Sequence, residues 1–166
     1  AYDGENSVKF KELYPESQGA LLFEPVSEQA AFLKEKFSGD DFFDVREIAF
    51  SDEDCRGSII ARGSSSTLDK WCSGGSVILK TIDSFIRDEG ITPDFIKMDI
   101  EGSEVEALNG ALQVIGDRKP NLAISVYHRA SHLVDIFDIL KKANPNYRFY
   151  LRHYTEGYTE TVLFAV

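Results

Sequence analysis

Short apolar segments of strand length alternate with longer segments of helical periodicity along the whole chain. The pattern is clearest in the second half, where the apolar segments 95–99 and 122–127 each precede a segment with apolar residues every three or four positions. Such alternation is typical of a mostly parallel sheet with helices on both faces. The sequence therefore predicts an α/β fold. Residues 147–154 and 159–166 predict a C-terminal antiparallel hairpin, joined by residues 155–158.

Turn and capping residues mark the ends of most of these elements. No repeat and no linker interrupts the chain, so we expect one domain over residues 1–166. The Ser- and Gly-rich segment 63–76 is either a loop over the site or a surface loop without function. The predicted strands are 19–23, 42–50, 58–61, 77–82, 95–99 and 122–127. Two helices are predicted in the first half, over 5–14 and over 28–37, the second with Ser27 as its N-cap. Three more are predicted in the second half. One runs from Asp83 to Gly90, one begins at the capping box Ser103-x-x-Glu106 and is interrupted at Asn109-Gly110, and one begins at Ser131 and ends before Pro145.

The charge balance argues against a nucleic-acid partner. The 166 residues include 28 acidic and 18 basic side chains, for a net charge of −10. A duplex-binding domain usually carries a basic face, and no run of Lys or Arg is present in the sequence. The negative field suits a cationic ligand, or it serves solubility alone. No window reaches the roughly 18 uncharged apolar residues of a membrane span.

The cysteines and the N-terminus bear on location. Cys55 and Cys72 form no C-x-x-C motif, so a zinc site is unsupported. They fit reduced thiols in a cytoplasmic protein, and a single disulfide is the weaker alternative. No basic flank followed by an apolar stretch marks a signal peptide. Because the chain begins at Ala1 without an initiator methionine, we expect it to be the C-terminal portion of a longer protein.

Polar residues follow several predicted strands at their carboxyl ends, where open α/β sheets bind ligands. Glu24 follows strand 19–23, and such a carboxylate can accept hydrogen bonds from both ribose hydroxyls; the alternative is a solvated strand end. Asp99 and Glu101 lie at the end of strand 95–99. If residues 95–101 stay extended, these two side chains project to the same side. Glu101 could instead charge the N-terminus of the following helix.

His128 follows strand 122–127 and has the intrinsic pKa of a general base. Its alternative role is a strand-end histidine hydrogen-bonded to the backbone. His128, His132 and the nearby Asp135 also suggest a metal site. However, His128 is predicted to end a strand and His132 to begin a helix, so they need not share a face, and we expect no metal.

Several of these segments resemble one family. The segment Asp94 to Glu104, DFIKMDIEGSE, with Ala107-Leu108 and Gly110-Ala111, resembles the K-x-D-x-E-G-x-E…L-x-G-A signature of FkbM-type methyltransferases. Weaker similarities occur in the family's order at Leu22 to Pro25, Ala49 to Asp52, Thr81 to Phe85, Arg152 to Tyr154 and Glu160 to Leu163.

The resemblance implies S-adenosylmethionine as cofactor and methyl transfer to a hydroxyl of a sugar, glycan or natural product. It also implies a Rossmann-like seven-stranded sheet in the order 3-2-1-4-5-7-6, with strand 7 antiparallel. The family's first motif is an apolar strand, an acidic residue and Gly-Ala-x-x-Gly. Ala1 to Gly4 matches only its tail, so the first strand and first glycine are missing from this sequence.

The resemblance and the strand-end positions together yield the candidate residues. The expected cofactor-binding residues are Ala1, Tyr2, Gly4, Glu24, Ala49, Ser51 and Asp99, and the expected catalytic residues are Asp99, Glu101 and His128. We expect Glu24, Asp99 and His128 to point into one crevice. The alternative function is a non-catalytic α/β ligand-binding or interaction module that has lost a complete cofactor site, and another nucleotide-using α/β protein is a weaker one.

Overall fold

The computed structural model describes residues 1–62, 65–69, 75–157 and 159–166. The chain divides into two compact units. Unit 1 comprises Ala1–Ala49, Arg56–Ile59 and Asp69–Leu79, and unit 2 comprises Phe50–Cys55, Ile60–Leu68 and Lys80–Val166. The expectation of a single domain over 1–166 stays a prediction. No helix in the described part of the chain is long and apolar enough to cross a membrane.

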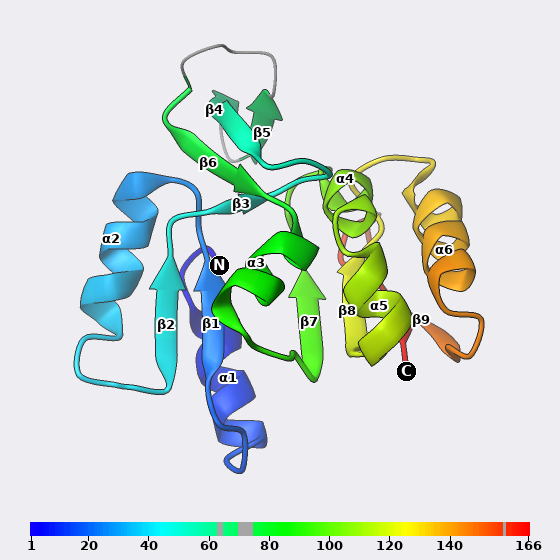
Figure 1. Ribbon diagram of the computed structural model, residues 1–166, viewed down its shortest axis with the longest axis horizontal. Helices are drawn as coiled ribbons and strands as arrows, with labels where there is room; N and C mark the ends of the chain where they lie inside the picture. Colours follow the sequence, from blue (N-terminus) through cyan, green and yellow to red (C-terminus); the bar gives the residue numbers. More distant parts are fainter. Residues whose placement is uncertain (63–64, 70–74, 158) are drawn as a thin grey trace. The chain divides into compact units, whose positions relative to one another are not determined.

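Unit 1 is built around a pair of parallel strands (Figure 1). Its elements are α1 (Glu5–Leu13), β1 (Ala20–Phe23), α2 (Ser27–Lys36) and β2 (Phe43–Arg46). Ala20 lies opposite Phe43 and Phe23 opposite Arg46, so both strands end at the same edge. The buried side chains of this unit are Leu22, Leu33, Phe37 and Val45, against which Val8, Ala20 and Phe43 pack.

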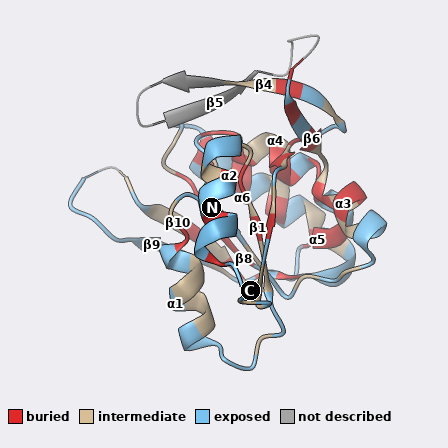
Figure 2. Cartoon of the chain, turned by 90° about the vertical axis from the view of Figure 1, so that its left-hand side faces the viewer, coloured by how far each residue is buried: buried red, intermediate tan, exposed pale blue. Residues whose placement is uncertain are grey.

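Gly4 connects α1 to this core. Its φ of 76° is left-handed, and it is the N-cap residue of α1. A methyl group at this position would lie 2.7 Å from the Phe37 ring and 3.1 Å from Leu33, so both the backbone angle and the space favour glycine. The helix itself has no buried residue and is drawn in the colours of exposed and intermediate residues (Figure 2).

Unit 2 contains a four-stranded sheet in the order β7-β8-β10-β9. Strands β7 and β8 are parallel, and β10 is antiparallel to both β8 and β9. The strands are β7 (Phe95–Met98), β8 (Asn121–Ser125), β9 (Phe149–His153) and β10 (Thr161–Ala165), and the helices are α3 (Ile82–Glu89), α4 (Glu104–Asn109), α5 (Leu112–Arg118) and α6 (His132–Ala143). Helix α6 packs against α4 and α5. The core includes Met98, Leu108, Ile124, Ile136 and Leu163.

A third sheet has the strand order β3-β6-β4-β5. Its strands are β3 (Ala49–Phe50), β4 (Cys55–Arg62), β5 (Ser65–Asp69) and β6 (Val77–Lys80), and they contribute residues to both units. The loop predicted over 63–76 is therefore wrong for β5, where strand pairing overrides a composition typical of loops. Residues 63–64 and 70–74, including Cys72, lie outside the described residues.

The single strand predicted over 42–50 is also wrong. It is broken into β2 and β3, because β2 pairs with β1 whereas β3 pairs with β6, and the chain changes partner at Glu47 and Ile48. Glu47 accepts a hydrogen bond from the Ser27 hydroxyl at this break.

Two of the predicted helix caps, at Asp83 and Ser103, do not form the expected hydrogen bonds. Thr81 caps α3 by accepting the Ser84 N–H at 3.0 Å, while the Asp83 carboxylate accepts the N–H groups of Gln113 and Val114 at the start of α5. Ser103 makes no capping hydrogen bond, since its φ of −98° and ψ of 13° are not the extended geometry of a side-chain cap. The predicted end of α3 at Gly90 is confirmed by its left-handed φ of 66°.

The predicted α/β class is confirmed. The order β7-β8-β10-β9 with β10 antiparallel is the order implied for strands 4-5-7-6, and the pair β1-β2 corresponds to strands 2 and 3. Among the described residues these strands belong to two separate sheets, so the continuous seven-stranded sheet stays an expectation.

Candidate functional site

Glu24 lies at the carboxyl end of β1 in unit 1, and the N-terminal turn folds onto it. The ammonium group of Ala1 donates to Glu24 Oε2 at 3.0 Å, and the Tyr2 N–H donates to the same oxygen at 3.2 Å. The Val26 N–H donates to Oε1 at 3.2 Å. The structure therefore brings Ala1, Tyr2 and Glu24 together beside the Gly4 turn, four of the residues expected to bind the cofactor.

The chemistry of this group fits a ribose, with one condition. A carboxylate has about four lone-pair positions, and three backbone donors occupy Glu24 here. A ribose diol that binds both hydroxyls to Glu24 must therefore displace one of these three donors. At the start of α1, after the left-handed Gly4, the Glu5 N–H already donates to Asp3 Oδ1 at 3.0 Å.

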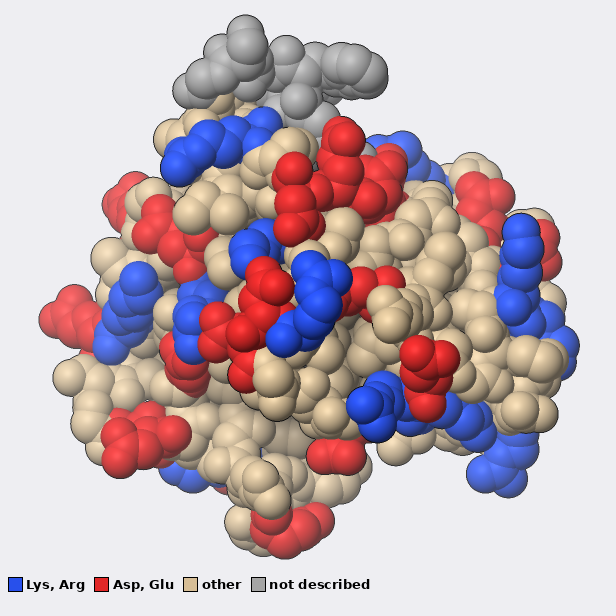
Figure 3. Space-filling model, in the orientation of Figure 1, with Lys and Arg blue, Asp and Glu red and all other residues tan. Residues whose placement is uncertain are grey.

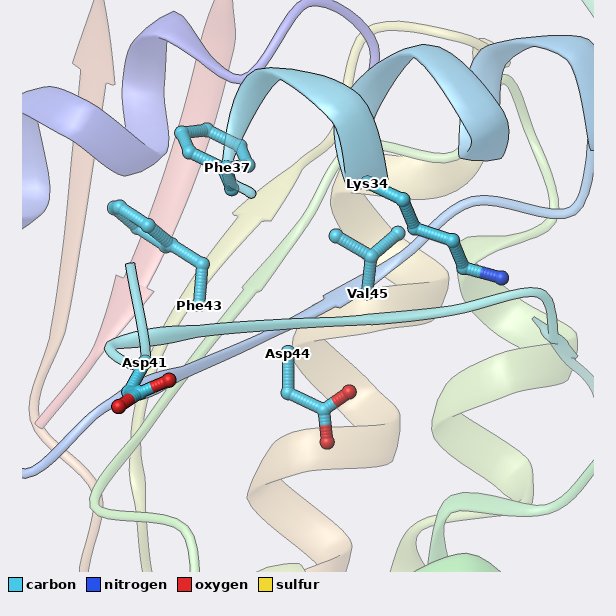
Figure 4. Close-up of a pocket in the computed structure, with 6 residues that line it drawn as sticks. All are labelled: Lys34, Phe37, Asp41, Phe43, Asp44 and Val45. Atoms are coloured by element: carbon cyan, nitrogen blue, oxygen red, sulfur yellow. The ribbon is translucent and has the colours of Figure 1, made fainter. Parts of the chain in front are cut away.

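Unit 1 also contains a hollow of about 400 Å³ along β2 (Figure 4). Lys34, Asp41 and Asp44 place charges of both signs around the rings of Phe37 and Phe43, with Val45 completing the wall. The hollow flanks the start of β2, whereas Glu24 follows the carboxyl end of β1. It is therefore not the predicted cofactor site.

A cluster of titratable groups forms around His128 in unit 2. His128 Nε2 lies 3.5 Å from Asp99 Oδ1 and 3.8 Å from Glu101 Oε2. The structure thus brings together all three expected catalytic residues. The extended backbone expected over 95–101 is wrong, because β7 ends at Met98 and Glu101 adopts a left-handed φ of 56°. The turn at Glu101 and Gly102, rather than strand alternation, aims both carboxylates at His128.

Asp99 has further partners on the same side. The Tyr127 hydroxyl donates to Asp99 Oδ1 at 3.2 Å, and Lys97 Nζ lies 3.7 Å from Oδ2. Partial burial and the negative charge of Asp99 raise the pKa of Tyr127, which therefore stays a neutral donor. The Tyr127 and His128 rings are tilted against each other with centroids 4.2 Å apart.

Sequence reasoning missed Glu104, the last residue of the D-x-E-G-x-E signature. Its side chain is completely buried in the first turn of α4. Oε1 accepts the Ile100 N–H at 2.9 Å and lies 2.8 Å from His128 Nδ1, and Oε2 lies 3.3 Å from His132 Nδ1. Its place in the signature was the one signal that could have identified it.

The pKa values of Glu104, His128 and His132 shift in different directions from their ordinary values. Burial disfavours the ionised form of Glu104, but His128 and the Ile100 N–H outweigh it and lower the Glu104 pKa. Burial also opposes protonation of His128, yet Glu104, Asp99 and Glu101 together raise the His128 pKa. For His132 burial prevails, and its pKa is lowered despite Glu104.

The two histidines share a partner although one follows a strand and the other begins a helix. His132, at the start of α6, is buried and faces the carboxylate that also faces His128. Asp99, Glu104 and His128 each offer one possible metal-ligand atom, and these atoms lie within 4.8 Å of one another. Asp135 is exposed on α6.

The remaining candidates are Ala49 and Ser51. Ala49 is buried in β3. The Ser51 side chain is completely buried: its hydroxyl donates to Asp52 at 3.1 Å, and its N–H donates to the Lys80 carbonyl at 2.9 Å. Ser51 therefore has no exposed side-chain surface for adenine, and the cofactor roles of both residues stay predictions.

The candidate residues thus form two groups, one in each unit. Ala1, Tyr2, Gly4 and Glu24 belong to unit 1, and Asp99, Glu101 and His128 belong to unit 2. The single crevice joining Glu24, Asp99 and His128 stays a prediction. Acidic and basic side chains intermingle over the face drawn in Figure 3.

The parallel strands, the carboxylate after β1 and the acid–histidine cluster after β7 and β8 define an α/β protein with ligand chemistry at its strand ends. The chain belongs to the FkbM methyltransferase family, since residues 21–149 match the model of the methyltransferase FkbM domain. The resemblance seen in the signature is thereby confirmed.

A solved structure supports the assignment. The chain is similar to the crystal structure of methyltransferase FkbM from Methylobacillus flagellatus KT, with 25% sequence identity and a TM-score of 0.72. The alignment covers 99% of this chain and 42% of that chain, so this chain spans less than half the length of its relative. A comparison with curated proteins finds no match.

Proposed function

We propose that this chain is the methyltransferase domain of an enzyme that methylates a hydroxyl group with S-adenosylmethionine. The proposed acceptor is a small molecule or glycan: a sugar, a glycan chain or a natural product. Family membership supports the methyltransferase class. The observation that supports a hydroxyl acceptor is the His128 imidazole, with Asp99 and Glu101 on one side and Glu104 on the other.

A hydroxyl group needs help to act as a nucleophile, because its pKa lies far above 7. A positioned base accelerates such reactions by ~10²–10⁴-fold. Bound S-adenosylmethionine would supply the methyl group on a positively charged sulfur atom. His128 Nε2 receives the acceptor proton, while Asp99 and Tyr127 orient the hydroxyl beside it. Alignment of the acceptor contributes about 7–11 kcal/mol.

The charge of the cluster suits both tasks. Asp99 and Glu101 place two carboxylates where a cation is favoured, and the same charges raise the His128 pKa. Because only neutral His128 accepts a proton, we expect the rate to rise with pH through the raised His128 pKa.

Glu24 and the Ala1–Gly4 turn are the proposed cofactor-binding group. Glu24 would accept the ribose hydroxyls, and the turn before α1 would hold the amino-acid end. We expect the 166 residues alone to bind S-adenosylmethionine little or not at all, because they contain only the tail of the family's first motif.

Calorimetry tests the cofactor directly. The full-length protein and the 166-residue chain are each titrated with S-adenosylmethionine and S-adenosylhomocysteine. The full-length protein is then incubated with radiolabelled S-adenosylmethionine and a panel of monosaccharides, oligosaccharides and hydroxylated natural products. Label recovered in an ether bond supports the proposal. Failure of the full-length protein to bind either cofactor form would contradict it.

A non-catalytic module is the second candidate, and one observation favours it. Three backbone donors already hold the Glu24 carboxylate. If these donors are permanent, Glu24 can accept only one ribose hydroxyl, and ligand binding without methyl transfer becomes the alternative. Absence of cofactor binding, with selective binding of an acceptor from the same panel, supports this alternative.

A further inference from the structure

The completely buried carboxylate of Glu104 faces two imidazole rings. His128 Nδ1 lies 2.8 Å from Oε1, and His132 Nδ1 lies 3.3 Å from Oε2. The Ile100 N–H holds Oε1 at 2.9 Å, so the backbone after β7 fixes the direction of the carboxylate.

An ionised carboxylate is only an acceptor of hydrogen bonds. His128 Nδ1 lies 2.8 Å from Oε1, so a proton on Nδ1 is favoured over two facing lone pairs, although the contact is not aligned as a regular hydrogen bond. In a neutral imidazole only one nitrogen carries a proton, so a proton on Nδ1 leaves Nε2 with a free lone pair. Both ring nitrogens of His128 are buried and neither forms a regular hydrogen bond with the described residues, so an acceptor must part Asp99 and Glu101 to reach Nε2.

We propose that Glu104 is a positioning residue of the methyl-transfer site, which holds His128 in the Nδ1–H tautomer and so presents Nε2 to the acceptor hydroxyl. The role of Nε2 as a base in this inference rests on the proposed function. The proton moves from the acceptor oxygen to Nε2, while Glu104 stays ionised and stabilises the imidazolium that forms.

His132 completes the arrangement from the other side. From α6 its Nδ1 lies 3.3 Å from the second oxygen of Glu104, without forming a regular hydrogen bond. The groups facing His128 are Asp99 and Glu101 from the turn after β7, and Glu104 from α4. Arg129 and Glu106 act on His132.

The alternative is that His128 Nε2 coordinates a divalent cation. Asp99, Glu104 and His128 offer ligand atoms within 4.8 Å of one another, and a histidine bound to a metal commonly donates its other N–H to a carboxylate. The tautomer alone does not distinguish a base from a metal ligand, so the experiment includes a metal.

Long-range proton–nitrogen NMR of the ¹⁵N-histidine-labelled protein reads out the tautomer without cofactor or acceptor. We expect the neutral form of His128 to carry its proton on Nδ1. In Glu104→Gln, which keeps the side-chain size, we expect this preference to be lost and proton binding at His128 to weaken by roughly tenfold or more. The Glu101→Gln variant is the matched control: it removes a charge beside the other nitrogen, so proton binding weakens but the tautomer persists.

The wild-type spectrum keeps the test decisive even if Glu104→Gln fails to fold. A neutral His128 with its proton on Nε2 overturns the proposal, and so does an unchanged tautomer in folded Glu104→Gln. Selective broadening of the His128 signals by micromolar Mn²⁺ also overturns it, because the lone pair then belongs to a metal. Cofactor binding plays no part in these readouts, so failure here is distinguishable from failure of the proposed methyl transfer.

Discussion

Two buried glutamates at the ends of parallel strands have neighbours of different chemistry. Glu24, after β1, is held by the backbone donors of Ala1, Tyr2 and Val26. Glu104, after β7, faces the imidazole rings of His128 and His132. The amides of Tyr2 and Val26 have a fixed protonation state, whereas imidazoles gain and lose protons near neutral pH.

The Glu24 and Glu104 carboxylates are suited to different functions because their hydrogen-bond partners differ. A carboxylate held by backbone amides can exchange one hydrogen-bond donor for another, which suits the binding of a ligand's hydroxyl groups. A carboxylate that faces imidazoles sets their proton affinity, which suits acid–base chemistry. Changes in the unit 1 group should therefore alter cofactor affinity, and changes in the unit 2 group should alter rate and pH dependence.

The largest expected effect is that of Asp99→Asn. This substitution should abolish most methyl transfer, by ~10²-fold or more, because the acceptor loses a charged partner beside His128. Its melting temperature should change little, since the Asp99 side chain is partly exposed and its ion pair with Lys97 is on the surface. Radiolabel transfer to an accepted substrate and thermal unfolding check the two expectations.

Asp138→Asn, an exposed position on α6, is the matched control. Activity retained in Asp99→Asn would remove Asp99 from the site. Joint loss of activity and stability would indicate a purely structural role.

The second effect concerns Glu24. Glu24→Ala should weaken S-adenosylmethionine binding by about 1–3 kcal/mol, the cost of losing hydrogen bonds to a charged acceptor. The rate at saturating cofactor should change far less, because Glu24 plays no part in proton transfer. Calorimetry of the protein that includes the upstream strand measures the affinity, with the exposed Glu35→Ala on α2 as control. Equal S-adenosylmethionine affinity in Glu24→Ala and Glu35→Ala would mean that Glu24 only binds the backbone at the end of β1.

The positions of Asp99 and Glu24 are predictable from the sequence, because the ends of strands can be recognised from the amino-acid pattern. Phe95, Ile96 and Met98 follow Pro93 and precede Gly102, so the amino-acid pattern alone puts Asp99 at the carboxyl end of a strand. The same reasoning puts Glu24 after the segment 19–23. The β5 strand is not predictable in this way, since its Ser-rich sequence lacks alternating apolar residues and its pairing with β4 supplies the order.

Glu104 is missed for a different physical reason. A charged residue in the first turn of a helix usually faces solvent or the helix dipole, so the pattern of Ser103 and Glu106 predicts a capping box. The inward direction of Glu104 depends on the packing of α4 against α6, which brings His132 beside it. Local sequence carries no information about that contact.

The third effect is a pH dependence of stability that differs between the two histidines. The raised His128 pKa means that the folded state binds its proton more tightly, so its contribution is full below the ordinary value of 6.5 and is lost as pH rises through the folded pKa. The lowered His132 pKa has the opposite sign, and stability is lost as pH falls from 6.5 toward the folded pKa.

Urea unfolding between pH 5 and 8 separates these contributions. His128→Asn should lose less stability than the wild type as the pH rises, and His132→Asn should lose less as it falls. Identical pH profiles in both variants would mean that Glu104 does not distinguish its two partners.

The smallest expected effect is a response to salt, and it separates the two sides of the His128 ring. Asp99 and Glu101 are partly exposed, so their attraction for protonated His128 is screened by ions, whereas Glu104 is buried and is screened much less. Raising NaCl from 0.05 to 1 M, conditions over which the Debye length falls to about 3 Å, should lower the His128 pKa without changing its tautomer. The decrease should be smaller than that caused by Glu104→Gln, and NMR titration measures it. Glu101→Gln should show a weaker salt response than the wild type, because one screened partner is already gone. An unchanged salt response of the His128 pKa in Glu101→Gln would mean that Asp99 alone provides the exposed charge that acts on His128.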